Sequence, residues 1–173
     1  ACEPHVQDLC RMLNGMGAAI SGIGTNLLTI DGVRALHGVT FTVPPDFIDV
    51  ASFLAAGAVT GGAVSVDNAR AADLDVVARG FGKLGLRWSL KGDRLSVGSK
   101  TKLRVHNDFG SAIPKIEDGP WPSFPSDLMS IAIVLATQAE GTLLFFEKMF
   151  ESRMYFVDRL IEMGARIVQC DPH

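Results

Sequence analysis

PDFIDVASFLAAGAVTGGAVSV, residues 45–66, is the stretch from which the fold of this chain can be predicted. Its Pro-Asp pair is a typical helix start, an apolar helix follows, and a glycine leads into a short strand at residues 62–66. The same block recurs downstream, where Pro125-Ser126-Asp127 opens a second apolar helix that leads to a glycine-led strand at residues 141–145. A block that recurs along a chain indicates a structural repeat.

A second shared pattern is a helix that ends in Met or Leu, then Gly, then a short strand. It occurs at Met16-Gly17, Leu84-Gly85 and Met163-Gly164. Glycine at this point supplies the left-handed residue that turns a helix into the next strand. When the three copies are aligned on this glycine, apolar residues fall at matching positions. In the helix these are Leu13, Phe81 and Leu160, and four residues earlier Leu9, Val77 and Phe156; in the strand after the glycine they are Ile20, Trp88 and Ile167. Their spacing predicts one buried face on each helix.

The two patterns combine into a βαβαββ module. Strands are predicted at Val39–Val43 and Leu103–Val105, ahead of the proline-marked helices. In the first two copies of the helix–glycine pattern, a second strand is predicted to follow the first across a turn, at Leu27–Ile30 and at Arg94–Val97. The predicted class is α+β, built from α/β modules. The chain is expected to begin partway through one module and to stop one strand short of completing another, at Cys170–His173, so the repeat is incomplete at both ends.

Composition excludes several functional classes. The chain has 173 residues, 47% of them hydrophobic, and a net charge of −3 without a Lys/Arg-rich run. This predicts a globular protein without a nucleic-acid groove, because such a groove needs clustered cations. The longest apolar run, near residues 129–137, is far below the roughly 20 residues of a membrane span, and no secretory signal is expected.

The cysteines and histidines predict no metal site. Cys2, Cys10 and Cys170 are odd in number and far apart, which suits reduced thiols in the cytoplasm. The four histidines are equally scattered and form no ligand spacing.

Several segments resemble the enolpyruvyl transferase family, in order and across the entire chain. They are Glu3-Pro4, Val43-Pro44-Pro45-Asp46, Trp121–Asp127 and Phe150-Glu151-Ser152-Arg153, which are similar to the family's EP, PDxIE, PxPGFPTD and FENRF segments. The resemblance implies the family fold, an inside-out α/β barrel in each of two domains that close over the substrates.

The resemblance also implies a domain division and a reaction. Residues 1–43 would end the last module of one domain, residues 44–173 would form two modules of the other, and the hinge would lie near residues 33–45. The reaction would transfer the enolpyruvyl group of phosphoenolpyruvate to the 3-hydroxyl of UDP-N-acetylglucosamine, without a metal or prosthetic group. The family's cysteine loop and late arginines match nothing here, so the chain alone is expected to be inactive and to need the rest of its parent.

Asp127 and Arg153 are the catalytic candidates. By resemblance Asp127 contacts the sugar 3-hydroxyl as general base, although an acidic residue in a first helical turn is also favoured by the helix dipole alone. Arg153 stands where the repeat has the apolar Val6 and Leu74, so its guanidinium requires a cleft, a carboxylate or access to solvent. By resemblance it lies near phosphoenolpyruvate.

Four further residues are substrate-binding candidates by resemblance, each with a structural alternative. Met149 would bind through its main chain, and its alternative is a core residue; the alternative for Phe150 is a core aromatic. The alternative for Asp46 is a helix cap, and the alternative for Glu3 is an acidic residue in a first helical turn.

Departures from the family pattern at His5, Trp121 and Ser152 leave a second function open. This would be a diverged enolpyruvyl transferase with another acceptor, such as the shikimate branch, or a ligand-binding paralogue without catalysis. The segments at Phe124–Asp127 and Phe150–Arg153 favour the amino-sugar acceptor.

Overall fold

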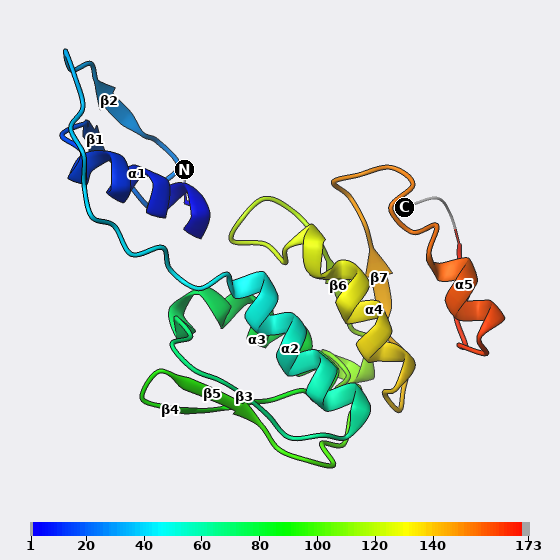
Figure 1. The fold of residues 1–173 in the computed structure, drawn as a ribbon. Helices are drawn as coiled ribbons and strands as arrows, with labels where there is room; N and C mark the ends of the chain where they lie inside the picture. The colour runs from blue at the N-terminus through cyan, green and yellow to red at the C-terminus, as the bar shows by residue number, and fades with distance from the viewer. Residues whose placement is uncertain (1, 171–173) are drawn as a thin grey trace. The chain divides into compact units, whose positions relative to one another are not determined.

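The computed structural model describes residues 2–170, and the chain divides into two compact units, 1–45 and 46–173. Each unit is described by itself (Figure 1). The first unit contains α1 (Pro4–Gly15), β1 (Ala19–Ser21) and β2 (Thr29–Asp31). The second contains α2 (Phe47–Thr60), β3 (Val64–Val66), η1 (Ala71–Leu74), α3 (Asp75–Lys83), β4 (Ser89–Lys91), β5 (Arg94–Val97), η2 (Phe109–Ser111), β6 (Lys115–Glu117), η3 (Ser126–Leu128), α4 (Met129–Thr137), β7 (Leu144–Phe146) and α5 (Val157–Glu162). Across these described residues, none of the helices has the length and apolar character needed to traverse a bilayer.

The first unit is a helix followed by an antiparallel hairpin. Ile20 of β1 pairs with Ile30 of β2, close to the predicted strand pair. The Asn14 side chain links the helix to the hairpin, because it donates to the Ile20 carbonyl and accepts from the Ile20 N–H, both at 2.8 Å. Leu9 was predicted on a buried helix face, but it is 51% exposed, and Cys10 is the residue buried instead.

The three predicted helix–glycine junctions share one hydrogen-bond pattern. Gly17, Gly85 and Gly164 all have positive φ, at 96°, 83° and 97°. The N–H of the residue after each glycine donates to the carbonyl five residues back, on Leu13, Phe81 and Leu160, at 3.0, 3.1 and 2.9 Å. This is the bond that closes a helix through a left-handed residue. The superposition predicted from sequence is therefore confirmed at these junctions.

Helix α2 carries much of the second unit's core. Asp46 caps it by accepting from the Ile48 N–H at 2.8 Å, and Gly61 ends it with φ 66°. Its buried positions recur at helical spacing: Phe47, Val50, Ala51, Leu54, Ala55 and Ala58. This face packs on α4, seen beside α2 in Figure 1, and on β3 and β5.

The three-stranded sheet of the second unit has the order β3-β5-β4, antiparallel throughout. The predicted hairpin at residues 91–97 is present as β4, a turn and β5. Leu95 and Val97 of β5 point into the core, at 0% and 1% exposure. The alternation buries one face of the strand against α2.

A parallel pair, β6 and β7, was only half predicted. β7 falls within the predicted strand at residues 141–145 and one residue beyond it, and its partner is β6, in the register Ile116 to Phe145. The strand predicted at Leu103–Val105 is not a strand, and this segment forms one isolated bridge, between Arg104 and Glu140. β6 was missed because a three-residue segment between Pro114 and Asp118 has no periodicity of its own.

Two other predicted strands are absent from the described residues. Val39–Val43 and the segment around Ile167 are irregular. Apolar residues predict a strand in both places, but a strand exists only where a neighbouring strand completes its hydrogen bonds. Within residues 2–170 neither segment has such a partner.

Candidate functional site

Asp127 and Arg153, the two predicted catalytic residues, are in direct contact. An Arg153 Nη2 donates to Asp127 Oδ1 at 2.6 Å. Asp127 lies in η3 just before α4. Arg153 lies in the turn that precedes α5 and not in a helix, unlike its repeat counterpart Val6 in α1. The carboxylate side chain is 67% exposed and the arginine side chain 34% exposed. The guanidinium therefore has a carboxylate partner, as a half-buried arginine requires.

Phe150 and Met149 lie on the same turn as Arg153. The Arg153 Cζ is 5.1 Å from the centroid of the Phe150 ring, which is cation–π geometry. Phe150 is 50% exposed and Met149 is 42% exposed, so neither belongs to the core. This turn carries an exposed aromatic residue beside the guanidinium.

Asp46 lies next to the segment that contains Asp127. As the N-cap of α2 it precedes Phe47, whose ring meets the Trp121 ring edge to face with centroids 5.5 Å apart. The cap role expected as its alternative is present, because Asp46 accepts from the Ile48 N–H.

Glu3 lies in the first unit, at the N-cap position of α1. Its side chain makes no cap hydrogen bond, and it lies 4.0 Å from His5 Nδ1. Its main-chain carbonyl accepts from the Gln7 N–H at 3.0 Å.

Two acidic residues near this site were missed by sequence reasoning. Asp118 and Glu147 follow β6 and β7 directly and are 2% and 1% exposed. The Lys148 N–H donates to Asp118 Oδ1 at 2.6 Å, and the Met149 and Phe150 N–H groups donate to Glu147 Oε1 at 3.2 and 3.3 Å. Both carboxyls thus bind the main chain of the turn that carries Arg153. Prediction of β6 would have found them, because carboxyl ends of parallel strands share one sheet edge.

The charges around this edge are paired. Glu117, the last residue of β6, contacts Lys115 Nζ at 2.5 Å and Lys148 Nζ at 3.0 Å. Hydrogen bonds from the two lysines, with Lys115 the larger influence, hold the pKa of Glu117 below its ordinary value. Burial raises the pKa of Glu147 to about 7, and the nearby Asp118 carboxyl acts in the same direction.

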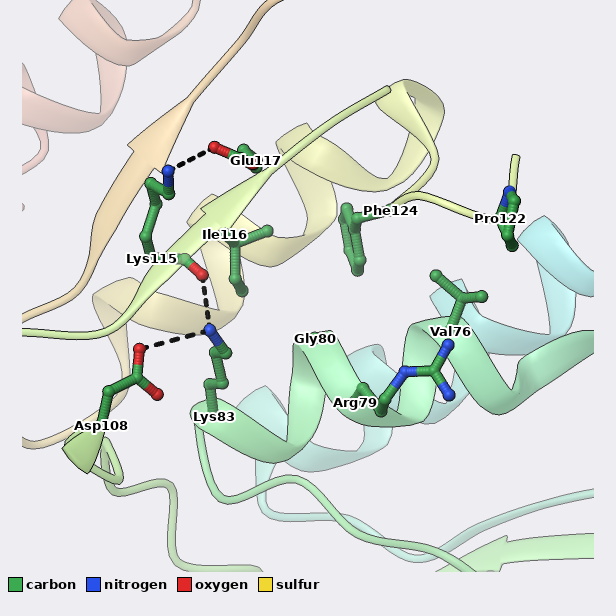
Figure 2. A pocket seen from close by; sticks show the side chains of 10 residues that line it. All are labelled: Val76, Arg79, Gly80, Lys83, Asp108, Lys115, Ile116, Glu117, Pro122 and Phe124. Carbon is green, nitrogen blue, oxygen red and sulfur yellow. Dashed lines mark hydrogen bonds and ion pairs between the residues drawn. The ribbon is translucent and has the colours of Figure 1, made fainter. Parts of the chain in front are cut away.

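A cavity of about 410 Å³ lies elsewhere in the second unit, along α3 and β6 (Figure 2). Lys83 Nζ reaches the Lys115 carbonyl at 2.8 Å and Asp108 at 3.6 Å, and these contacts close one side of it. None of the predicted site residues lines this cavity. Its two lysines are held by neighbouring carboxyl and carbonyl groups, whereas the Arg79 guanidinium also lines it (Figure 2).

Within residues 2–170 no group of three or more His, Cys, Asp or Glu side chains could hold a metal ion. Cys10 and Cys170 are free thiols. The site chemistry available here is that of a carboxylate, a guanidinium and main-chain groups.

Comparison with known proteins gives a consistent picture. The model of the EPSP synthase family, described as 3-phosphoshikimate 1-carboxyvinyltransferase, matches residues 1–171. Over all 173 residues the chain is 57% identical to UDP-N-acetylglucosamine 1-carboxyvinyltransferase of Treponema pallidum and 53% identical to that of Bradyrhizobium diazoefficiens. It is 47% identical to the protein of this name from Bacteroides thetaiotaomicron. The chain spans about 40% of the length of these relatives.

The fold is also found in a solved structure. The enolpyruvyl transferase NikO from Streptomyces tendae matches with a TM-score of 0.81 at 24% identity, over 98% of this chain and 39% of that one. The α+β enolpyruvyl transferase fold predicted from the repeat and the motifs is therefore confirmed.

Proposed function

Because the chain belongs to the EPSP synthase family, we propose that it is part of an enolpyruvyl transferase that uses UDP-N-acetylglucosamine as acceptor and phosphoenolpyruvate as donor. Relatives with that acceptor in their name, 46–57% identical over the whole chain, support this choice over the shikimate branch. The reaction would be the first committed step of peptidoglycan synthesis and would take place in the cytoplasm. The rest of the parent chain would supply the other groups that the reaction needs.

The contact between Asp127 and Arg153 is the observation that carries the proposal. The enolpyruvyl carbon must be attacked by the sugar 3-hydroxyl, which loses its proton, and phosphate must leave. Asp127 Oδ1 accepts from Arg153, and among the described residues nothing donates to Oδ2. This second oxygen is available to accept the hydroxyl proton. The remaining donors of Arg153 suit the carboxylate or phosphate of phosphoenolpyruvate.

The turn before α5 would hold the acceptor. We assign the Met149 main chain and the Phe150 ring to the nucleotide sugar, since both residues are partly exposed on the turn that carries Arg153. Asp46 would line the same cleft, next to Trp121. Glu3 would also contact the substrates, and residues 1–43 and 44–173 would belong to different domains.

The test uses the full-length parent protein with three variants: Asp127→Asn, Arg153→Lys and, as a matched control, Asp93→Asn in the exposed turn between β4 and β5. Isothermal titration measures UDP-N-acetylglucosamine binding, and phosphate release measures turnover with phosphoenolpyruvate. We expect Asp127→Asn to lower kcat at least 100-fold, because the base is lost. Arg153→Lys should lower kcat/KM for phosphoenolpyruvate about tenfold or more, because the planar fork is lost.

Asp93→Asn should match the wild type. Turnover with shikimate 3-phosphate in place of the nucleotide sugar would move the assignment to the shikimate branch. Binding of the nucleotide sugar without phosphate release in the wild type would identify a non-catalytic paralogue.

A further inference from the structure

The pairing of Asp118 with Glu147 at the sheet edge calls for an explanation, because buried carboxyls are costly. An ionised carboxylate loses several kcal/mol of hydration on burial unless hydrogen bonds replace the water. Three main-chain N–H groups, on residues 148–150, supply part of that replacement. They reach only one oxygen of each carboxyl.

The other oxygens, Asp118 Oδ2 and Glu147 Oε2, are buried and receive no donor from the described residues. The two carboxyls are neighbours, because Glu117 pairs with Phe146 in the parallel register and Asp118 and Glu147 are the next residue on each strand. After burial, the nearby Asp118 carboxyl also raises the pKa of Glu147. Two carboxylates cannot donate to each other. A single proton held between them satisfies both oxygens and removes one of two like charges.

Other charged groups near this edge are occupied elsewhere. Lys148, adjacent to Glu147, pairs with Glu117 at 3.0 Å, and Lys115 pairs with the same carboxylate. Arg153 pairs with Asp127. In the described structure these cations are engaged by other carboxylates, so a proton is the simplest group to balance the acid pair.

We propose that Asp118 and Glu147, sharing one proton, are positioning residues that hold the main chain of residues 148–150 in the shape that binds the acceptor. Through this turn they also hold the Phe150 ring against Arg153. The inference rests on the proposed function, which places UDP-N-acetylglucosamine on this turn. When the shared proton is lost, two adjacent carboxylates repel and the turn loosens.

The test is acceptor binding against pH in the full-length protein. Isothermal titration of UDP-N-acetylglucosamine is run from pH 5.5 to 8.5, without phosphoenolpyruvate, whose phosphate titrates in this range. The pKa of Glu147 is raised to about 7, so the pair holds its proton below pH 7 and loses it above. We expect the wild-type affinity to fall about tenfold as the pH rises through 7.

Glu147→Gln is the decisive variant. Its amide keeps one oxygen as acceptor for the turn and offers a permanent donor to Asp118. It should bind within about twofold of the wild type at pH 6 and show no loss at pH 8.5. Glu147→Ala should bind at least tenfold more weakly at every pH. Glu140→Gln, an exposed carboxyl after α4, is the matched control and should keep the wild-type profile.

Amide hydrogen exchange of residues 148–150, measured without ligand in the same proteins, separates this inference from the proposed function. Protection factors should fall above pH 7 in the wild type and stay level in Glu147→Gln. If protection is the same in both at every pH, the shared-proton clamp is refuted. A different outcome is that protection behaves as expected while no nucleotide sugar binds. The shared proton of Asp118 and Glu147 then stands as a structural feature, but its role in acceptor binding and the proposed function are both overturned.

Discussion

Helix α3 meets the segment that leads to Asp127 at a glycine, and this contact gives the sharpest test of the packing. A Cβ added at Gly80 would lie 2.5 Å from both Cδ2 and Cε2 of Phe124. Phe124 is 6% exposed and also packs on Phe81, with ring centroids 5.9 Å apart. The ring therefore cannot turn away freely, and Gly80→Ala should displace it.

The magnitude follows from two opposing effects. Forcing an extra methyl into a packed core costs about 1–3 kcal/mol. Alanine in place of a helical glycine recovers about 1 kcal/mol. Gly80→Ala should therefore lower the free energy of unfolding by up to about 2 kcal/mol. Gly82→Ala, in the same helix with nothing within 4 Å of an added Cβ, should raise it by about 0.5–1 kcal/mol.

The assay is urea denaturation of both variants and the wild type, in the full-length protein, followed by tryptophan fluorescence. The difference between the two glycine variants isolates the clash, because helix propensity is common to both. Phe124→Leu in the Gly80→Ala background should recover part of the loss. If Gly80→Ala is as stable as Gly82→Ala, the contact between α3 and Phe124 is not as described and the reasoning fails.

Three further predictions concern single residues of the second unit. Asp46→Ala should cost about 0.5–2 kcal/mol in thermal unfolding, since the Ile48 N–H loses its cap; an unchanged midpoint would contradict the cap. Leu54→Ala, at a fully buried position, should cost about 2–5 kcal/mol by urea titration, and a loss below 1 kcal/mol would place this side chain outside the core. Gly85→Ala should lower the free energy of unfolding by about 1–3 kcal/mol, because φ is 83° and the new Cβ would lie 2.9 Å from the Arg104 N and O atoms. Thermal melting followed by circular dichroism measures this loss, and an unchanged melting temperature would refute the strain.

What could be predicted from sequence is what short-range physics controls. The three helix–glycine junctions were found because a left-handed residue and a hydrogen bond five residues back involve only neighbouring residues. The apolar helix that begins at Pro45-Asp46 and the β4–β5 hairpin were predicted for the same reason. The irregular segments at Val39–Val43 and around Ile167 were mispredicted as strands, since an apolar segment does not say whether a partner strand lies beside it.

The sequence by itself determined the family, the modular fold and the selection of Asp127 and Arg153 as catalytic candidates, because motifs and helical periodicity depend only on the order of residues along the chain. Only the tertiary structure decided that these two side chains touch, and that Asp118 and Glu147 lie buried together beneath their turn. Both contacts depend on the parallel pairing of β6 with β7 across the α4 crossover. Pairing between strands distant in the chain is decided by burial and by ladder hydrogen bonds, and neither is visible in a three-residue strand.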